Sequence, residues 1–331
     1  MQNISLTYQN PVYDQYMADP FIMAHTVRYY AYGTSPEPLD GRWFPVLESG
    51  DMVHWESRGG ALYPPLGADE FWAPAVAFWD GVFVLYYSAH GIEGRDHQLR
   101  VATSISPLGP FQDTGQVLSP NDPFSIDAHP FQDADGQRYL FYAHDFLESS
   151  TSYRVGTGIV VDRLLDHTRL EGQPRLVVRP HADWQLFQTA RRMYDCVYDW
   201  YTVEGPAVLV RNNRYYCFYS GGSWKCDNYG ISYVVSDHPL GPYRLSPQSD
   251  GPILKSVPGK VIGPGHNSWV QTEGTGQFFA VYHAWDAART RRLMRIDPVF
   301  WDNDQPYFDG PTWTPQDLFR TSPSNSAQEA G

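Results

Sequence analysis

Short apolar runs rich in aromatic residues recur along the chain, and each follows an anchor residue beside proline or glycine. The strands predicted from these runs lie at residues 29–32, 83–87, 139–142, 215–219 and 278–282. Their anchors are Asp19, Trp72, Asp127, Glu204 and His266. Consecutive anchors lie 53, 55, 77 and 62 residues apart, which indicates an internal repeat. A repeat that returns an anchor at the same place in each unit predicts one shared site.

The passage that follows the aromatic strand also repeats. Ser106-Pro107-Leu108-Gly109-Pro110-Phe111 and Asp237-His238-Pro239-Leu240-Gly241-Pro242-Tyr243 have the same pattern. Each anchor interval leaves room for a four-stranded antiparallel blade, which takes about 40–50 residues in known repeat types. The pattern therefore predicts an all-β fold, a five-bladed β-propeller with blades of four antiparallel strands around a central channel. The anchors would meet at one mouth of that channel.

Composition agrees with many short strands joined by turns. Of the 331 residues, 15% are aromatic and 18% are charged, and the chain has 28 Gly and 27 Pro. Asp80-Gly81 and Asn212-Asn213 stand between apolar runs and predict hairpin turns. We expect one catalytic domain over residues 1–320 and a flexible tail over 321–331.

Charge and segment composition restrict the partners and the location. The formal net charge of −13 opposes binding to nucleic acid or to an anionic membrane. No stretch reaches the roughly 20 apolar residues that span a bilayer. Residues 1–10 lack the basic and apolar segments of a secretory signal, so we expect a cytoplasmic protein. The pattern leaves the oligomeric state open.

The three cysteines are Cys196, Cys217 and Cys226, and no pair has the Cys-x-x-Cys spacing of a metal site. An odd number of thiols fits a reducing compartment. Cys217 lies within an aromatic strand, where a free cysteine is predicted to be part of the core.

Three of the anchors are acidic: Asp19, Asp127 and Glu204. Three carboxylates around one channel mouth repel one another, which raises the pKa of at least one and favours an acid beside an ionised base. Such a pair hydrolyses glycosidic bonds, and an inverting enzyme separates its two carboxyl groups by about 6.5–9.5 Å. The alternative is that each acidic residue only caps a turn.

The motifs together resemble glycoside hydrolase family 43. They are Ala18-Asp19-Pro20-Phe21, Trp72-Ala73-Pro74, Ser125-Ile126-Asp127, Val203-Glu204-Gly205-Pro206 and Gly265-His266-Asn267, and the resemblance spans about residues 10–315. That family consists of five-bladed propeller enzymes, mostly arabinofuranosidases, arabinanases and β-xylosidases. The resemblance implies that Asp19 is the general base, Glu204 is the general acid, and Asp127 orients the acid and keeps its pKa high. The residues alone leave base and acid unassigned between Asp19 and Glu204.

Two anchors are predicted to shape the pocket. Trp72 is a candidate platform for a sugar ring, although a core tryptophan is the alternative. The resemblance places His266 at the channel centre, near a calcium or other ion held through water. One imidazole is a poor site for a hard cation, which prefers several oxygen ligands. We therefore expect no cofactor for the chemistry and at most a structural ion near His266.

Further residues are candidates for substrate binding. Arg295 matches a family position for an arginine that reaches the sugar or the catalytic carboxylates. His129 lies two residues after Asp127, on the same face of the predicted strand, and a core histidine is the alternative to a pocket residue. The aromatic segment 194–201 and Trp224 are candidates for the walls of subsites.

We therefore predict an inverting exo-glycosidase of the α-L-arabinofuranosidase type. It would remove terminal arabinofuranosyl groups from plant-derived arabino-oligosaccharides. β-Xylosidase is the alternative, and family β-xylosidases commonly carry a further β-sandwich, whereas only some 30 residues follow Trp301 here. An endo-arabinanase and a non-catalytic carbohydrate-binding propeller are also retained, because a fold does not determine a function.

Overall fold

The computed structural model describes residues 6–272 and 275–319. Apart from two single-turn 3-10 helices, η1 (Ile92–Gly94) and η2 (Asp183–Gln185), the regular elements of these residues are strands. The all-β prediction is confirmed. The predicted tail at 321–331 lies outside the described residues. Within the described chain, neither helix has the length or the apolar composition needed to cross a membrane.

Most strands belong to five antiparallel units that follow the order of the sequence. Unit 1 contains β2 (Ala18–His25), β3 (Arg28–Thr34), β4 (Trp43–Ser49) and β5 (Trp55–Leu62). Unit 2 contains β6 (Glu70–Trp79), β7 (Val82–His90), β8 (Gln98–Ser104) and β9 (Gln112–Val117). Unit 3 contains β10 (Ser125–Gln132), β11 (Arg138–Phe146) and β12 (Gly156–Asp166), with β13 (Arg169–Leu170) and β14 (Arg175–Val178) paired to β12. Unit 4 contains β15 (Leu186–Met193), β16 (Cys196–Arg211), β17 (Arg214–Gly221), β18 (Gly230–Ser236) and β19 (Arg244–Leu245). Unit 5 contains β20 (Ile262–Gln271), β21 (Phe278–Trp285) and β22 (Arg292–Pro298).

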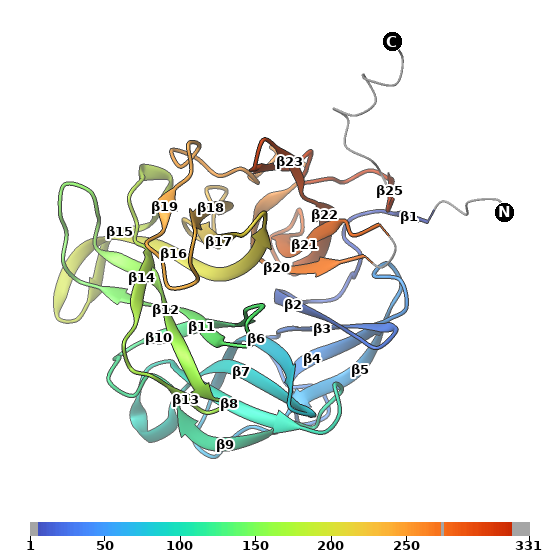
Figure 1. Cartoon of the computed structure of the whole chain (residues 1–331), viewed down its shortest axis with the longest axis horizontal. Coiled ribbons are helices and arrows are strands. Elements are labelled where there is room, and N and C mark those ends of the chain that lie inside the picture. Colours follow the sequence, from blue (N-terminus) through green and yellow to red (C-terminus); the bar gives the residue numbers. More distant parts are fainter. Residues whose placement is uncertain (1–5, 273–274, 320–331) are drawn as a thin grey trace, which may run out of the picture.

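The units follow one another around the molecule (Figure 1). Their anchor-bearing strands contact each other in turn: β2 contacts β6, β6 contacts β10, β10 contacts β16, and β16 contacts β20. The last of them, β20, returns to contact β2. A short parallel pairing of β12 with β16 also joins units 3 and 4 into one hydrogen-bonded sheet. The five anchor strands therefore surround a common centre.

The chain before β2 lies along unit 5. The Val12 N–H donates to the Met294 carbonyl at 3.0 Å, and the Met17 N–H donates to the Arg292 carbonyl at 2.9 Å. Farther out, β1 (Thr7–Tyr8) pairs with β25 (Gln316–Asp317). The remaining hairpin consists of β23 (Phe300–Asp302) and β24 (Gln305–Tyr307). Residues 12–17 are thus hydrogen-bonded to the last unit.

The hairpin turns agree with their sequence signals. Asp80 and Gly81 connect β6 to β7 with φ of 53° and 80°, and Asn212 and Asn213 connect β16 to β17 with φ of 49° and 56°. Two successive positive φ angles are the requirement of a type I′ turn, which glycine, asparagine and aspartate meet at the lowest cost. The predicted turns are confirmed.

Each anchor strand has a β-bulge at its anchor. The register of pairing with the next strand shifts between Ala18 and Phe21, Trp72 and Ala75, Ile126 and His129, Glu204 and Ala207, and Gly265 and Ser268. The residue inside each bulge has positive φ: Asp19 (48°), Ala73 (49°), Asp127 (61°), Gly205 (58°) and His266 (54°). A bulge redirects side chains, so it aims the anchors at the common centre.

The bulges are held by the neighbouring unit. In four of them the amide N–H of the positive-φ residue donates to a neutral side chain on the strand that follows the anchor strand of the preceding unit. These bonds join Ala73 to Thr34 Oγ1 at 2.9 Å, Asp127 to Ser88 Oγ at 3.2 Å, His266 to Ser220 Oγ at 2.6 Å and Asp19 to His283 Nδ1 at 3.0 Å. A non-glycine residue at positive φ costs about 1–3 kcal/mol, and these bonds help to offset that cost. The His283 bond runs from unit 5 back to unit 1.

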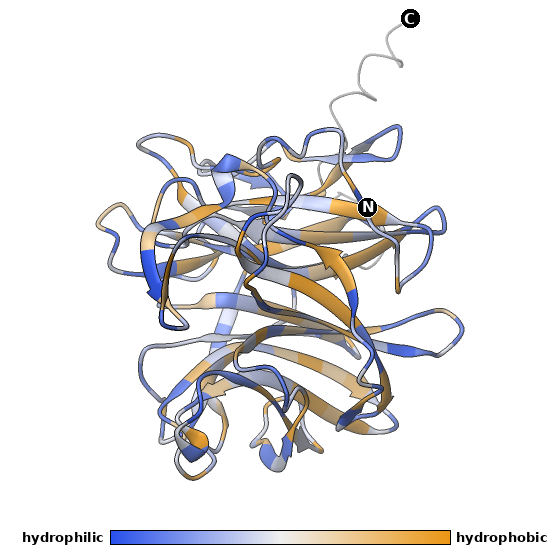
Figure 2. Ribbon diagram, turned by 90° about the vertical axis from the view of Figure 1, so that its left-hand side faces the viewer, coloured by the Kyte–Doolittle hydropathy of each residue, from blue (hydrophilic) through white to orange (hydrophobic). Residues whose placement is uncertain are grey.

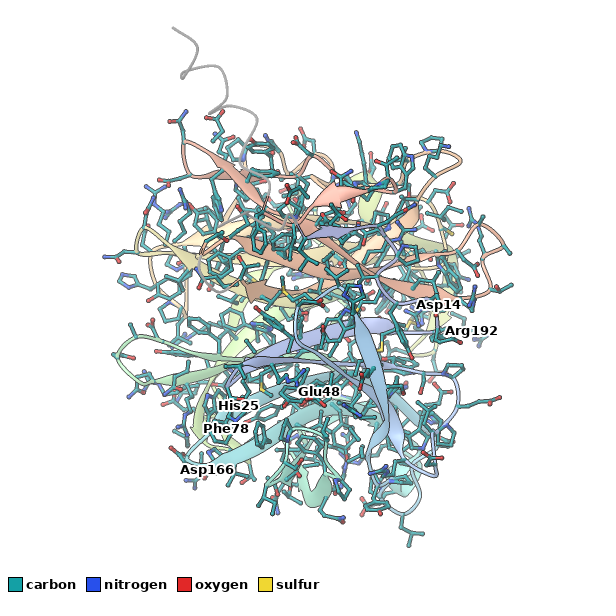
Figure 3. All side chains as sticks on the ribbon, turned by 90° about the vertical axis from the view of Figure 1, so that its right-hand side faces the viewer. Asp14, His25, Glu48, Phe78, Asp166 and Arg192 are labelled. Atoms are coloured by element: carbon teal, nitrogen blue, oxygen red, sulfur yellow. The ribbon has the colours of Figure 1, made fainter. Side chains whose placement is uncertain are left out.

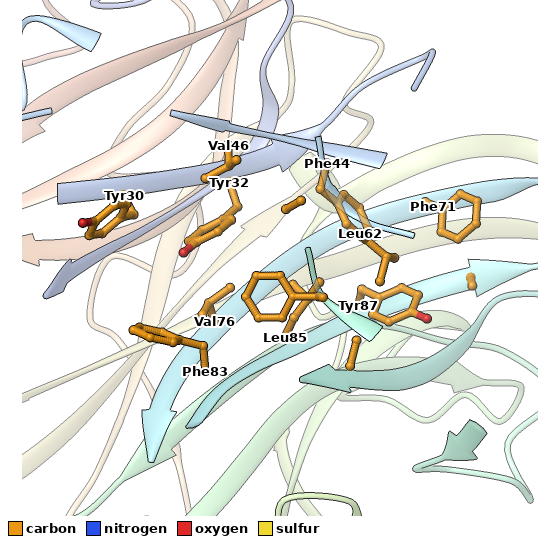
Figure 4. Packing of buried hydrophobic residues seen from close by; sticks show 14 residues of the cluster. Tyr30, Tyr32, Phe44, Val46, Leu62, Phe71, Val76, Phe83, Leu85 and Tyr87 are labelled. Atoms are coloured by element: carbon orange, nitrogen blue, oxygen red, sulfur yellow. The ribbon is translucent and has the colours of Figure 1, made fainter. Parts of the chain in front are cut away.

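The spaces between units are filled by aromatic and branched side chains. Between units 1 and 2, Phe44 packs edge-on against Tyr87 with ring centroids 5.7 Å apart, and Leu62 and Leu85 are fully buried beside them (Figure 4). Apolar residues concentrate on the strands and polar ones on many of the connecting loops (Figure 2). Each such side chain contributes about 1.5–3 kcal/mol when fully buried. Cys217 is buried, as predicted.

The far ends of the anchor strands are joined by ring contacts as well. His25 ends β2 and Phe78 lies near the end of β6, and their rings are 4.6 Å apart (Figure 3).

Candidate active site

A cavity of about 460 Å³ lies at the anchor ends of the five strands. The anchors Asp19, Trp72, Asp127, Glu204 and His266 all line it, each from a different unit. Its other lining residues are Tyr16, Thr34, Ser35, Pro36, Trp43, Asp69, Glu70, Phe71, Ile126, Trp224 and Arg292. The convergence expected from the repeat is thus observed.

Asp19 lies in a positively charged corner of the cavity. Its Oδ1 is 3.2 Å from Arg292 Nη1 and 3.4 Å from the Nδ1 atoms of both His266 and His283. Burial raises the pKa of Asp19, but Arg292 and then the two histidines lower it by more, so the pKa falls below its ordinary value. Asp19 is therefore ionised at neutral pH and can accept a proton.

Arg292 is held rigidly beside Asp19. Its Nε donates to the Tyr16 hydroxyl at 3.1 Å, and its guanidinium lies 4.5 Å from the ring centroid of Trp224. Both the arginine and the aspartate are largely buried, where an unpaired charge would be costly. The pairing keeps a negative charge at the base of the cavity.

Glu204 has the opposite environment. Its Oε1 accepts a hydrogen bond from the Tyr229 hydroxyl at 2.8 Å, and no salt bridge joins it to a cation among the described residues. Burial raises the pKa of Glu204 to about 7; the Tyr229 bond lowers it and Asp19 raises it further. A carboxyl group with this pKa is suited to donate a proton near neutral pH.

Asp127 lies beside the backbone of the acid. Its Oδ2 accepts the Gly205 N–H at 2.9 Å and lies 4.0 Å from His266 Nδ1. Burial raises the pKa of Asp127 well above its ordinary value, and the charges of Glu204 and Asp19 raise it further. Asp127 and Glu204 titrate as an interacting pair, so the two carboxyls share protons rather than ionising independently.

Two glycines make room for this arrangement. A Cβ on Gly265 would lie 2.1 Å from Cε1 of Tyr229, so the absence of a side chain there lets the tyrosine ring reach Glu204. A Cβ on Gly205 would lie 3.2 Å from the His266 ring, and Gly205 has a φ of 58°. Backbone and rings therefore approach closely where the acid is held.

Aromatic side chains form one wall of the cavity. Trp72 stacks on His97 with ring centroids 3.4 Å apart, and Trp43 stacks on Phe71 at 4.9 Å. Trp72 is partly exposed and so offers apolar surface to the cavity. Such a surface is suited to the C–H face of a sugar.

His266 lines the cavity, but its surroundings do not fit a cation. Burial lowers the pKa of His266, which favours a neutral ring. The nearest carboxylate, Asp19, already pairs with Arg292, and a calcium ion requires about six to eight oxygen ligands. Among the described residues, no group of three or more His, Cys, Asp or Glu side chains is arranged to hold a metal. These side chains alone therefore do not form a cation site, and an ion held near His266 through water stays a prediction.

Two predicted substrate-binding residues lie elsewhere and need correction. Arg295 does not line the cavity; it is buried and its Nη1 donates to the Thr312 carbonyl at 3.2 Å. His129 does not line it either, because its Nε2 accepts the Val208 N–H at 3.1 Å between units 3 and 4. Arg295 thus links β22 to the segment at Thr312, and His129 links β10 to β16. The bulge at residues 126–129 breaks the simple alternation that placed His129 beside Asp127.

Sequence reasoning missed Arg292, Tyr229 and His283. Arg292 lies three residues before Arg295, at an odd spacing that puts the two on opposite faces of β22. The alternation of side chains in β22 shows that only one of the two arginines can face the cavity, but the sequence does not show which face of the strand that is. Tyr229 precedes β18 and carries no motif. Of the predicted wall segments, Trp224 lines the cavity, whereas residues 194–201 do not.

Comparison with known proteins agrees with this geometry. The chain matches the model of glycosyl hydrolases family 43 over residues 8–306. It resembles the crystal structure of a thermostable family-43 glycoside hydrolase with a TM-score of 0.82 and 32% identity, over 95% of this chain and 100% of that one.

Sequence relatives differ in the sugar they release. A β-D-galactofuranosidase of Aspergillus niger is 28% identical, over 88% of this chain and 82% of its own length. An extracellular exo-α-(1→5)-L-arabinofuranosidase of Streptomyces avermitilis is 24% identical, over 91% of this chain and 62% of its own length, so this chain spans less than two thirds of that relative. The chain belongs to glycosyl hydrolases family 43 and is an enzyme that hydrolyses glycosidic bonds in oligosaccharide or polysaccharide substrates.

Proposed function

We propose that the protein is an inverting exo-acting α-L-arabinofuranosidase and that its five units are the blades of a β-propeller. The observation that carries the proposal is the contrast between Asp19 and Glu204 within one cavity. Arg292 keeps one carboxylate ionised, and burial raises the pKa of the other to about 7, so that it can hold a proton near neutral pH. This is the division of roles that a single-displacement glycosidase requires.

In the proposed reaction, Asp19 removes a proton from water while the water oxygen forms a bond to the anomeric carbon. The bond between that carbon and the leaving oxygen breaks, and Glu204 gives its proton to the leaving oxygen. Asp127 accepts the Gly205 N–H and so holds the backbone next to Glu204, with which it shares protons. Each turnover consumes one water and returns both carboxyls to their initial states after proton exchange with solvent. The proposed chemistry needs no cofactor.

The proposed sugar is based on the names of similar proteins and not on the shape of the cavity. Exo-arabinofuranosidases of two Streptomyces species and an arabinofuranosidase of Humicola insolens are 24–27% identical to this chain. The galactofuranosidase of Aspergillus niger, at 28%, makes a galactofuranoside the second candidate substrate. Both sugars are furanosides. β-Xylosidase relatives make xylosides the third. The cytoplasmic location stays a prediction.

The test compares 4-nitrophenyl α-L-arabinofuranoside, β-D-galactofuranoside and β-D-xylopyranoside at equal concentrations. We expect the largest kcat/KM on the arabinofuranoside, and a larger value on either other glycoside would replace the proposed substrate. Proton NMR of the first-formed sugar should show the inverted anomer; a retained anomer would exclude the single displacement. Arabino-oligosaccharides should release only arabinose at early times, whereas early oligosaccharide products would indicate endo action.

A further inference from the structure

One of the five bulges is held differently from the others. The residues that pair with the position before each bulge are Thr34, Ser88, Ala143, Ser220 and His283. Four of them are the neutral acceptors that bind the bulge amide of the next unit. The fifth, Ala143 on β11, has no acceptor on its side chain. Its unit precedes the one that carries Glu204 and Gly205.

The missing acceptor is replaced by a carboxylate. The Gly205 N–H would be the partner of a hydroxyl at residue 143, by analogy with the other four units. It instead donates to Asp127 Oδ2 at 2.9 Å. Ile126, which precedes Asp127, pairs with Ala143, so the aspartate reaches the amide from the neighbouring position in the same unit. An alanine at 143 therefore coincides with the one bulge in which a charged group binds the amide.

We propose that Ala143 is a positioning residue: by offering no hydroxyl to the Gly205 amide, it makes Asp127 the acceptor and thereby shifts the proton shared by Asp127 and Glu204 toward Glu204. This inference rests on the proposed role of Glu204 as the general acid. It adds a contact that draws the shared proton toward the glutamate, which is less buried than the aspartate.

The proton that the pair shares can lie on Asp127 or on Glu204. An amide N–H stabilises an ionised carboxylate more than a neutral carboxyl, because a hydrogen bond to a charged acceptor is the stronger one. With the amide on Asp127, the arrangement of ionised Asp127 and protonated Glu204 is favoured. If the amide turned to another acceptor, the proton would move toward Asp127, and Glu204 would lose its ability to donate.

Other charges act on the same pair. The groups that face Asp127 are Glu204, Asp19, Arg292 and His266, and those that face Glu204 are Tyr229, Asp19, Arg292 and Arg191. Asp19 and Arg292 act on both carboxyls, so they do little to select between them. Tyr229 bonds only to Glu204 and favours its ionised form. Arg191 also lowers the pKa of Glu204. The Gly205 amide lowers the pKa of Asp127, against the effect of burial, and so shifts the shared proton toward Glu204.

The variant Ala143→Ser restores the hydroxyl that Ser88 and Ser220 supply elsewhere. We expect kcat on the 4-nitrophenyl glycoside to fall about tenfold. Loss of a hydrogen bond to a charged carboxylate changes the pKa of that group by about one unit, which is a tenfold change in the protonation equilibrium. The alkaline limb of the pH–kcat profile should move to lower pH by about one unit, because Glu204 would ionise sooner. A 2,4-dinitrophenyl glycoside, whose leaving group needs no acid, should lose less than about threefold.

The matched control is Ala102→Ser, which buries the same hydroxyl at a fully buried alanine of β8 that does not line the cavity. It should keep the wild-type pH profile and leaving-group dependence. Equal effects of the two variants would overturn the proposal, as would an unchanged pH profile in Ala143→Ser. Failure of the proposed function is seen separately: Glu204→Gln would then retain activity on the 4-nitrophenyl glycoside in the otherwise unaltered chain.

A measurement on the unaltered protein tests the same bond without a variant. Glycine-selective ¹⁵N labelling would follow the amide of Gly205 and that of Gly263, which has the same φ of 58° and donates to the neutral Ser256 Oγ at 2.8 Å. We expect the Gly205 proton shift to titrate with the carboxyl pair between about pH 4 and 8 and the Gly263 shift to stay constant. A Gly205 amide that does not titrate would overturn the proposal even if Ala143→Ser fails to fold.

Discussion

Asp19 and Glu204 line one cavity, Asp19 buried and Glu204 partly buried, yet the charges around the two carboxyls differ. Asp19 has a guanidinium at 3.2 Å, whereas Glu204 has only a neutral hydroxyl donor at 2.8 Å. Burial raises the pKa of each carboxyl, and only for Asp19 does a fixed positive charge reverse the effect. Burial alone raises the pKa of a carboxyl and suits it to be a proton donor, whereas a paired cation lowers the pKa and suits it to be a base. Equivalent positions in the repeat can therefore have different catalytic roles.

Removing each carboxyl should give the largest effects and should separate the roles. We expect Asp19→Asn and Glu204→Gln each to lower kcat on the 4-nitrophenyl glycoside about 10²–10⁴-fold. With a 2,4-dinitrophenyl leaving group, Glu204→Gln should recover most of its activity and Asp19→Asn should recover none. Recovery in Asp19→Asn instead would reverse the assignment of base and acid. Steady-state rates on the two substrates check this.

Removing the cation should make the environment of Asp19 resemble that of Glu204. In Arg292→Met, the pKa of Asp19 should rise, because burial remains and the opposing charge is gone. The acidic limb of kcat/KM should then move to higher pH by about one unit or more. Arg292→Lys, which keeps the charge, is the control and should move it less. An acidic limb that is the same in both variants would show that Arg292 does not set the charge of Asp19.

Removing the Tyr229 hydroxyl should widen the difference in pKa between Glu204 and Asp19. The Tyr229 hydroxyl lowers the pKa of Glu204, so Tyr229→Phe should raise that pKa and move the alkaline limb of kcat to higher pH. Loss of one charged hydrogen bond should reduce kcat about threefold to tenfold. Tyr233→Phe on β18, away from the cavity, should leave the profile unchanged. A shift to lower pH would mean that Tyr229 acts by another contact.

The smallest effect is on stability. The folded-state pKa of Glu204, about 7, lies above its ordinary value of 4.5, so the wild type loses stability as pH rises through the folded pKa. Gln does not titrate. The Tm of Glu204→Gln should therefore equal that of the wild type below pH 4.5 and exceed it by a few degrees above pH 7. Thermal unfolding at several pH values checks this, and a constant difference would show that the charge of Glu204 is not the cause.

Much of the fold could be predicted because it depends on local patterns. Aromatic runs between turn signals predicted the strands, and Asp80-Gly81 has the positive φ angles that a tight hairpin demands. The anchors could be predicted to converge because a repeat puts equivalent residues at equivalent places. His129 and Arg295 were misplaced because a bulge and the facing of one strand changed which side chains point inward.

The sequence by itself determined that this is an all-β repeat with three acidic anchors in register, since composition, turn residues and spacing are local properties of the chain. Tertiary structure decided which anchor is ionised and which is protonated, because Arg292, Tyr229 and the Gly205 amide come from separate parts of the chain. Charge and hydrogen bonding act over a few ångströms in space. Contacts between residues tens or hundreds of positions apart therefore set the chemistry of each anchor.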